Sequence, residues 1–158
     1  LGKKNIFKLF SSVGLFSKEL NIEIHSKKPV DWDVNFAEKV YKEIKKNKCF
    51  VTNLAKCTQK DASHLHDSIF KEYRDIMLEE IELLNPKIII TFGNQVSSIL
   101  IGKTINVSLH RKKSEKLVIN NIYYEVYPVF YPVGQGMRNL KTAINDIKYI
   151  LNKNQSRL

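Results

Sequence analysis

The segment that most constrains this fold is the run KIIITF at residues 87–92, a short stretch rich in β-branched apolar side chains. Runs of this kind are typical of strands buried on both faces of a sheet. A helical pattern over residues 64–84 precedes the run, and a Gly-Asn pair leads from it into a helix over 95–101. A strand between two helices predicts an α/β fold with a mostly parallel sheet and helices on both faces.

The rest of the chain continues this alternation. Helices are predicted over 5–15, 35–47 and 137–152, a second buried strand over 49–53, a hairpin over 116–132 and irregular structure over 16–34. Asp33 or Asn35 would cap the second of these helices. Asn120 and Asn121 would form the hairpin turn, because asparagine tolerates the left-handed backbone that a tight turn needs. We expect one domain over residues 1–158.

Positive charge gathers in the C-terminal third of the chain. The sequence has 26 Lys and Arg against 16 Asp and Glu, and residues 101–158 hold ten basic and three acidic side chains. A basic end on a folded domain favours a polyanionic partner such as nucleic acid. The 22 Lys against 4 Arg are also typical of an AT-rich genome, so a lysine-rich surface without such a partner is the alternative.

The sequence has no feature of export or of membrane insertion. No apolar run approaches the roughly 18 residues that a transmembrane helix needs. The N-terminal stretch LGKKNIFKLF lacks the apolar core of a secretory signal. The two cysteines, Cys49 and Cys57, suit a reducing compartment. We therefore expect an intracellular protein, cytoplasmic or nuclear, that does not contact a membrane.

Polar residues and glycines stand where the predicted strands end. Asn53 ends the first strand, Gly93 and Asn94 follow the second, and a loop over 131–138 follows the hairpin. The carboxyl ends of parallel strands meet at one edge of a sheet, where ligands bind. Asn53 offers both a donor and an acceptor to the edge of a base. Each of these residues has a plain alternative role, since an asparagine can brace a loop and a glycine can simply form a turn.

The loop after the hairpin holds most of the candidate binding residues, which are Tyr131, Gly134, Gln135, Gly136, Met137 and Arg138. Its glycines let backbone N–H groups approach a phosphate closely. Arg138 at a helix start can reach a phosphate, and Met137 can wedge between bases. Arg111, in the basic stretch before the hairpin, is a further candidate contact to DNA.

Four stretches of the chain occur in an order and spacing that resemble a known family. They are FVTNLAKC at 50–57, LNPKIIITFG at 84–93 after a helix containing EEIELL, His110-Arg111 before the hairpin, and VYPVFYPVGQGMRN at 126–139. Together they resemble the uracil-DNA glycosylase superfamily, and the iron–sulfur, thermophile-type branch is the most similar. The resemblance runs from about residue 2 to residue 152.

The resemblance implies a three-layer α/β/α domain with a four-stranded, mostly parallel central sheet. It implies a DNA repair enzyme that flips a uracil, or a related damaged base, out of DNA and hydrolyses its N-glycosidic bond. Asn53 falls on the asparagine that reads uracil in this family. The segment 131–139 falls on the loop that enters the minor groove and contacts the flipped nucleotide.

The chain also departs from the family pattern. Tyr131 replaces the family's histidine, and Val133 replaces the serine that follows its proline. A tyrosine hydroxyl can still donate a hydrogen bond to an oxyanion as a catalytic group, or Tyr131 can instead pack against the sheet edge. By analogy, the family's first motif and first strand lie upstream of Gly2, so we expect the N-terminal part of the domain to be absent.

We expect no metal or other cofactor. Cys57 matches one cluster ligand of the iron–sulfur branch, but Tyr73 stands at the next ligand position, and such clusters need four thiolates. Cys49 suits a buried apolar position. The histidines have no convincing metal-ligand spacing, and we expect two of them, His64 and His66, at the surface; the other two are His25 and His110.

Two other functions remain open. A superfamily member without catalysis would bind nucleic acid or act as a structural partner protein, since loss of the first motif and of the histidine would produce such a protein. An unrelated nucleotide-binding α/β domain is less favoured, because the sequence contains neither GxGxxG nor GxxxxGK[ST].

Overall fold

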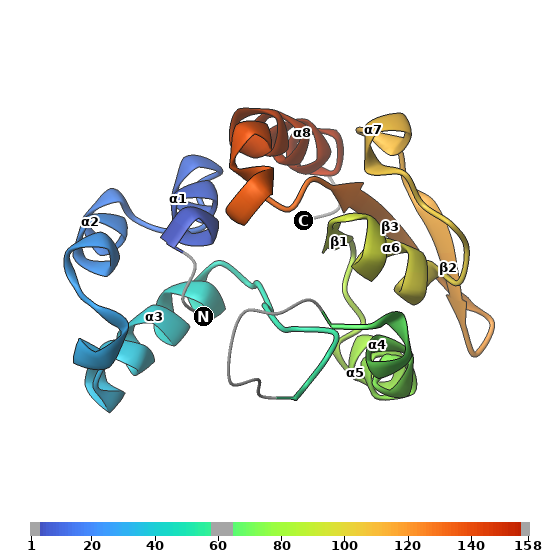
Figure 1. Cartoon of the computed structure of the whole chain (residues 1–158), viewed down its shortest axis with the longest axis horizontal. Helices are drawn as coiled ribbons and strands as arrows, with labels where there is room; N and C mark the ends of the chain where they lie inside the picture. Colours follow the sequence, from blue (N-terminus) through green and yellow to red (C-terminus); the bar gives the residue numbers. More distant parts are fainter. Residues whose placement is uncertain (1–3, 58–64, 156–158) are drawn as a thin grey trace. The chain divides into compact units, whose positions relative to one another are not determined.

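The computed structural model describes residues 4–57 and 65–155. The chain forms two compact units: a helical unit, residues 1–52 and 131–148, and a sheet unit, residues 53–130 and 149–158. Figure 1 shows that the strands belong to the sheet unit and that α8 continues from one unit into the other. The single domain expected over the whole chain stays a prediction.

The helical unit is built around aromatic side chains. Its elements are α1 (Lys4–Ser12), α2 (Lys18–Ser26), η1 (Pro29–Asp31), α3 (Val34–Lys46), η2 (Gly134–Asn139) and the first part of α8 (Leu140–Lys153). The rings of Trp32 and Phe36 meet edge to face with centroids 4.8 Å apart, and Phe7 lies 5.8 Å from Trp32 and 5.7 Å from Phe16. Aromatic pairs at such separations stabilise a small core beyond the area that they bury.

Side-chain caps start two of these helices. The Asp33 carboxylate accepts the N–H of Phe36 at 2.7 Å, so the predicted cap of α3 is confirmed. The Ser17 hydroxyl likewise accepts the N–H of Leu20 at 3.2 Å and starts α2. The prediction of irregular structure over 16–34 is therefore wrong for this part. The sequence signals that it overlooked are Ser17 as a cap and the i, i+4 spacing of the apolar residues Leu20 and Ile24.

The sheet unit contains a three-stranded mixed sheet in its described part. Its elements are α4 (Asp67–Glu72), α5 (Arg74–Leu84), β1 (Ile89–Phe92), α6 (Asn94–Ile101), α7 (Val107–His110), β2 (Glu115–Ile119), β3 (Ile122–Val129) and the end of α8. The strand order is β1-β3-β2. β1 runs parallel to β3, with Phe92 opposite Val129, and β2 runs antiparallel to β3, with Glu115 opposite Val126.

Helices cover both faces of β3. On one face, Tyr124 and Val126 pack in a core with residues of α5, α6 and β2, namely Met77, Ile81, Ile99, Leu100, Leu117 and Ile119, together with Leu54. On the other face, the fully buried Tyr127 accepts a hydrogen bond from Asn154 Nδ2 at 3.2 Å, just beyond the end of α8. The predicted α/β class, with helices on both faces of the sheet, is confirmed at this strand.

Three details of the prediction are corrected. Residues 49–53 form no strand, and Phe50 and Val51 are 60% and 40% exposed, because an apolar run becomes a strand only beside a paired neighbour. The described sheet has three strands and a single parallel pair, rather than four mostly parallel ones. The helix predicted over 64–84 is broken at Tyr73 into α4 and α5, and its first residue lies outside the described residues.

The hairpin turn agrees with the prediction. Asn120 and Asn121 have φ values of 46° and 65°, which is the left-handed pair that a two-residue turn needs. Asn120 also donates a 2.7 Å hydrogen bond from Nδ2 to Glu82 Oε1 and so ties the hairpin to α5. Among the described residues, no helix combines the length and the apolar character required to cross a membrane.

Candidate functional site

The carboxyl ends of β1 and β3 lie at the same edge of the sheet. The pair Phe92–Val129 ends the parallel ladder, and the next N–H, that of Gly93, donates to Val129 O at 2.8 Å. The chain leaves β1 through Gly93 with φ 87° and ψ 163°, a conformation open essentially to glycine alone. α6 begins at the following residue, so this edge joins a strand end directly to a helix start.

Hydroxyl groups fix this strand-to-helix junction. Ser97 donates from Oγ to Gly93 O at 2.7 Å, and its Oγ also lies 2.8 Å from Thr91 Oγ1. Both hydroxyl side chains are buried, Ser97 fully. The position of Gly93 and Asn94 at the sheet edge is therefore held by the core below them, which is the rigidity that a binding site requires.

A basic turn reaches the same edge through the sheet register. Glu115 lies opposite Val126, so the residues before it run antiparallel to β3 toward its carboxyl end. These residues include Arg111, Lys112 and Lys113, all of them exposed. Lys112 has a φ of 62° and places its ammonium group 5.1 Å from the centroid of the Tyr149 ring. The turn thus presents a cation held over an exposed aromatic face, as found in nucleic-acid sites.

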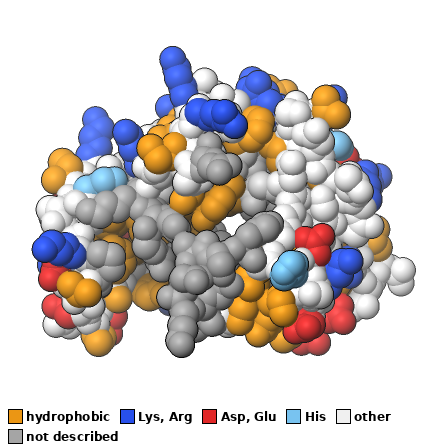
Figure 2. All heavy atoms as spheres, viewed as in Figure 1, with side chains coloured by type: hydrophobic (Ala, Val, Ile, Leu, Met, Phe, Trp, Pro, Cys, Tyr) orange, Lys and Arg blue, Asp and Glu red, His pale blue; other side chains and the backbone are white. Residues whose placement is uncertain are grey.

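Charge is divided unevenly over the helices around the sheet. Figure 2 shows Lys and Arg side chains over α7 and α8, and a group of acidic side chains over α4 and α5. Glu115 offsets part of the positive charge, since it forms an ion pair with Lys103 and its Oε1 lies 3.0 Å from His110 Nε2. Arg111, Lys112 and Lys113 add three consecutive positive charges next to this ion-paired group.

Asn53 lies at the start of a segment anchored in the sheet unit. Asn53 is exposed, whereas Leu54 and Ala55 are buried directly after it. Lys56 forms an ion pair with Glu80 of α5 at 2.7 Å. The chain around Asn53 is thus fixed by burial on one side, which leaves its carboxamide accessible to solvent.

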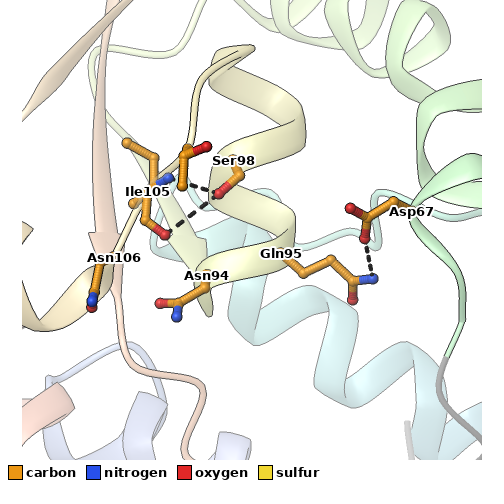
Figure 3. Close-up of a pocket in the computed structure, with 7 residues that line it drawn as sticks. Asp67, Asn94, Gln95, Ser98, Ile105 and Asn106 are labelled. Carbon is orange, nitrogen blue, oxygen red and sulfur yellow. Dashed lines mark hydrogen bonds between the residues drawn. The ribbon is translucent and has the colours of Figure 1, made fainter.

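A shallow polar depression of about 480 Å³ opens beside Asn94, wholly within the sheet unit. Three segments supply its walls: Asp67 at the start of α4, Asn94, Gln95 and Ser98 on α6, and Ile105 and Asn106 before α7 (Figure 3). Ser98 Oγ accepts the N–H of Ile105 at 2.8 Å, and Gln95 Nε2 donates to Asp67 Oδ1 at 2.7 Å. These bonds hold the three segments together.

The loop after β3 belongs to the helical unit and folds tightly on itself. Gly136 donates its N–H to Val133 O at 3.0 Å, and a Cβ on Gly136 would lie 1.9 Å from Tyr131 O. Gly134 has a φ of 58°. The loop exposes Met137 and Arg138 together with Tyr131, while the Gln135 side chain lies outside the described residues.

Tyr131 is 44% exposed and remains partly desolvated. Burial raises the pKa of its hydroxyl above the ordinary value of 10.0. Tyr131 therefore stays neutral at physiological pH and keeps its proton for hydrogen bonding.

The cysteines and histidines occupy unrelated positions. Burial raises the pKa of the Cys49 thiol, while Cys57 is exposed. His25 Nδ1 and His110 Nδ1 contact backbone carbonyls at 2.8 and 2.9 Å, His66 is exposed, and His64 lies outside the described residues. Within residues 4–57 and 65–155, no three His, Cys, Asp or Glu side chains form a group that could hold a metal ion. The two cysteines of this sequence also do not fit a cluster held by four thiolates.

Sequence reasoning missed three contributors to the sheet unit's surface. They are Asp67 and Asn106 in the depression and Tyr149 under Lys112. Asp67 and Asn106 stand at helix starts, where the sequence predicts caps rather than ligand contacts. Tyr149 belongs to a helix whose neighbours are set only by the tertiary structure.

Comparison with known families gives one result. The sequence model of the Uracil DNA glycosylase superfamily matches residues 8–153. No curated protein and no solved structure matches the chain significantly.

Proposed function

Because the chain belongs to the uracil DNA glycosylase superfamily, we propose that it binds DNA, extrudes a uracil or a related damaged base, and hydrolyses the N-glycosidic bond of that base.

The observation that carries the proposal is the shared edge of β1 and β3. Gly93 donates to Val129 O there, and the register of β2 brings the basic turn toward the same edge. Backbone N–H groups and the cations of residues 111–113 are the kinds of group that bind a phosphate backbone. These groups come from separate parts of the sequence and support a DNA-binding role for this edge.

The reaction requires few protein groups. The bond between C1′ and the base nitrogen breaks, and its electron pair leaves with the base as an anion. Water adds to C1′ and loses a proton, and the departed base anion takes up a proton, which gives an abasic sugar and a neutral free base. The protein must therefore hold the extruded base and stabilise negative charge on it as the bond breaks.

Two residues are proposed for these tasks by the resemblance. Asn53 would read the base, for which its exposed carboxamide offers one donor group and one acceptor. Tyr131 would donate a hydrogen bond to the departing base through its neutral hydroxyl. Gly134, Gly136, Met137 and Arg138 of the following loop would contact DNA, as would Gln135.

A superfamily member without catalysis is the second candidate function. The substitutions favour it, because Tyr131 stands where the family has a histidine and Val133 where it has a serine. A neutral tyrosine donates a hydrogen bond but adds no positive charge beside the leaving anion. DNA binding through the sheet edge is common to both functions.

The test is incubation of the full-length protein with uracil-containing single- and double-stranded oligonucleotides, followed by alkaline cleavage at abasic sites. We expect cleaved product, and Asn53→Ala is expected to abolish it while salt-sensitive DNA binding persists. Binding without any abasic product would refute the enzyme and support the non-catalytic function.

A further inference from the structure

We propose that the depression beside Asn94 is a subsite for a nucleobase, namely the base next to the extruded one in the same DNA strand. The proposal rests on the proposed function, since it needs DNA bound at the edge of β1 and β3. Asn94 directly follows Gly93 at that edge and also lines the depression. A strand that passes Gly93 therefore brings a neighbouring nucleotide to this place.

The orientation of the Asn94 carboxamide is fixed by the fold. Its Oδ1 accepts the backbone N–H of Val107 at 3.0 Å. A backbone N–H can only donate, so the oxygen must face it and cannot exchange places with the nitrogen. Nδ2 of Asn94, with its two N–H donors, is thus the atom left to meet a ligand.

The same argument fixes the orientation of two more carboxamides, those of Asn106 and Gln95. Asn106 Oδ1 accepts the N–H of Ser108 at 3.1 Å, which leaves Asn106 Nδ2 as a donor. Gln95 has the opposite orientation: its Nε2 donates to Leu65 O at 2.9 Å and to Asp67 Oδ1 at 2.7 Å. Gln95 Oε1 therefore remains as an acceptor. Figure 3 shows Gln95 turned toward Asp67, while Asn94 and Asn106 lie on the other side of the view.

The depression thus combines two fixed amide donors with the acceptors of Gln95 and Asp67. A phosphate presents acceptors only, and the Asp67 carboxylate would repel its charge. The edge of a nucleobase presents donors and acceptors side by side and is uncharged, which matches this set. The volume of the depression, about 480 Å³, lies in the range of small-ligand sites.

The probe is a set of fluorescent single-stranded oligonucleotides with one uracil, in which the base on its 5′ or 3′ side is A, C, G, T or absent. Anisotropy titration gives Kd for each. We expect removal of the base on one side to weaken binding about tenfold, the value of one well-made hydrogen-bonded base contact. Removal on the other side should change Kd little and serves as an internal reference.

The variant that tests the site is Asn106→Asp. An aspartate keeps the oxygen that accepts the Ser108 N–H, so the helix start is preserved, but the Nδ2 donor becomes a second acceptor. We expect the preference among flanking bases to shift from G and T, which carry a carbonyl oxygen at position 6 or 4, toward A and C, which carry an amino group there. Asn121→Asp at the hairpin turn is the matched control, because it adds the same charge outside the depression.

The readout is a ratio of Kd values, so a general loss of affinity from the added charge cancels. Equal Kd for oligonucleotides with and without both flanking bases would overturn the subsite. So would an Asn106→Asp variant that binds all flanking bases with the ratios of the control. Abasic product without any dependence on the flanking base would refute the subsite and retain the proposed function. A Kd that depends on the flanking base, without abasic product, would retain the subsite and refute the proposed hydrolysis.

Discussion

Gly136 is the position where a single methyl group should most disturb the loop after β3. A Cβ there would lie 1.9 Å from Tyr131 O and 3.1 Å from Tyr131 C. The first distance is roughly 1.5 Å inside the optimal separation of non-bonded atoms, and the neighbour is backbone that cannot rotate aside. Gly136→Ala must therefore open the turn between residues 131 and 136.

The loss of stability can be estimated from the interactions that are broken when this turn opens. The Gly136 N–H to Val133 O bond is 3.0 Å long, and its loss costs about 1 kcal/mol. Overpacking adds about 1–3 kcal/mol, so Gly136→Ala should lower the free energy of unfolding by about 2–4 kcal/mol. Gly134→Ala is the matched control, because its Cβ has no neighbour within 4 Å and its φ of 58° costs about 1–2 kcal/mol.

Urea unfolding followed by tryptophan fluorescence measures both variants. Trp32 is the single tryptophan of the sequence and lies in the helical unit, the unit that also contains the loop. The reasoning is wrong if Gly136→Ala is no more destabilising than Gly134→Ala. A second measurement, affinity for single-stranded DNA, should fall for Gly136→Ala, since the displaced loop also carries Met137 and Arg138.

Three further predictions concern other parts of the chain. Tyr124→Phe should be neutral or stabilising, because its buried hydroxyl has no hydrogen-bond partner in the described structure. Tyr127→Phe should lower the free energy of thermal unfolding by about 1–3 kcal/mol, because the buried Asn154 Nδ2 loses one of its two acceptors and keeps only Ile150 O; the reverse order would contradict this. At pH 8, iodoacetamide should modify the exposed Cys57 before Cys49, because the raised pKa of the Cys49 thiol lowers its thiolate fraction at this pH. Equal modification rates of the two cysteines, measured by mass spectrometry, would refute this prediction. Lys112→Gln should reduce the slope of log Kd against log salt for single-stranded DNA by about 0.7, and an unchanged slope would exclude a phosphate contact.

Local patterns were enough to predict most elements of the sheet unit. The KIIITF run, the glycine after it and the Asn120-Asn121 turn specify β1, the start of α6 and the hairpin, because each depends on neighbouring residues alone. Residues 49–53 carry the same apolar signal, yet Phe50 is exposed. Burial of a strand depends on a partner strand distant in sequence, and the run itself contains no information on whether that partner is beside it.

The candidate site likewise has one part that the sequence predicts and one part that it does not. Gly93 and the basic turn could be assigned to one sheet edge, because the rule that parallel strands end together needs only strand positions. The depression could not be predicted from the sequence, because its chemistry is set by the orientation of its carboxamide groups rather than by residue type. Asn94 and Gln95 are adjacent carboxamides, yet the Val107 N–H leaves the first as a donor, and Leu65 O with Asp67 leaves the second as an acceptor. An amide is symmetric in the sequence and becomes directional only when its partner is known, so the ligand class of this surface follows from hydrogen bonds that only the folded chain contains.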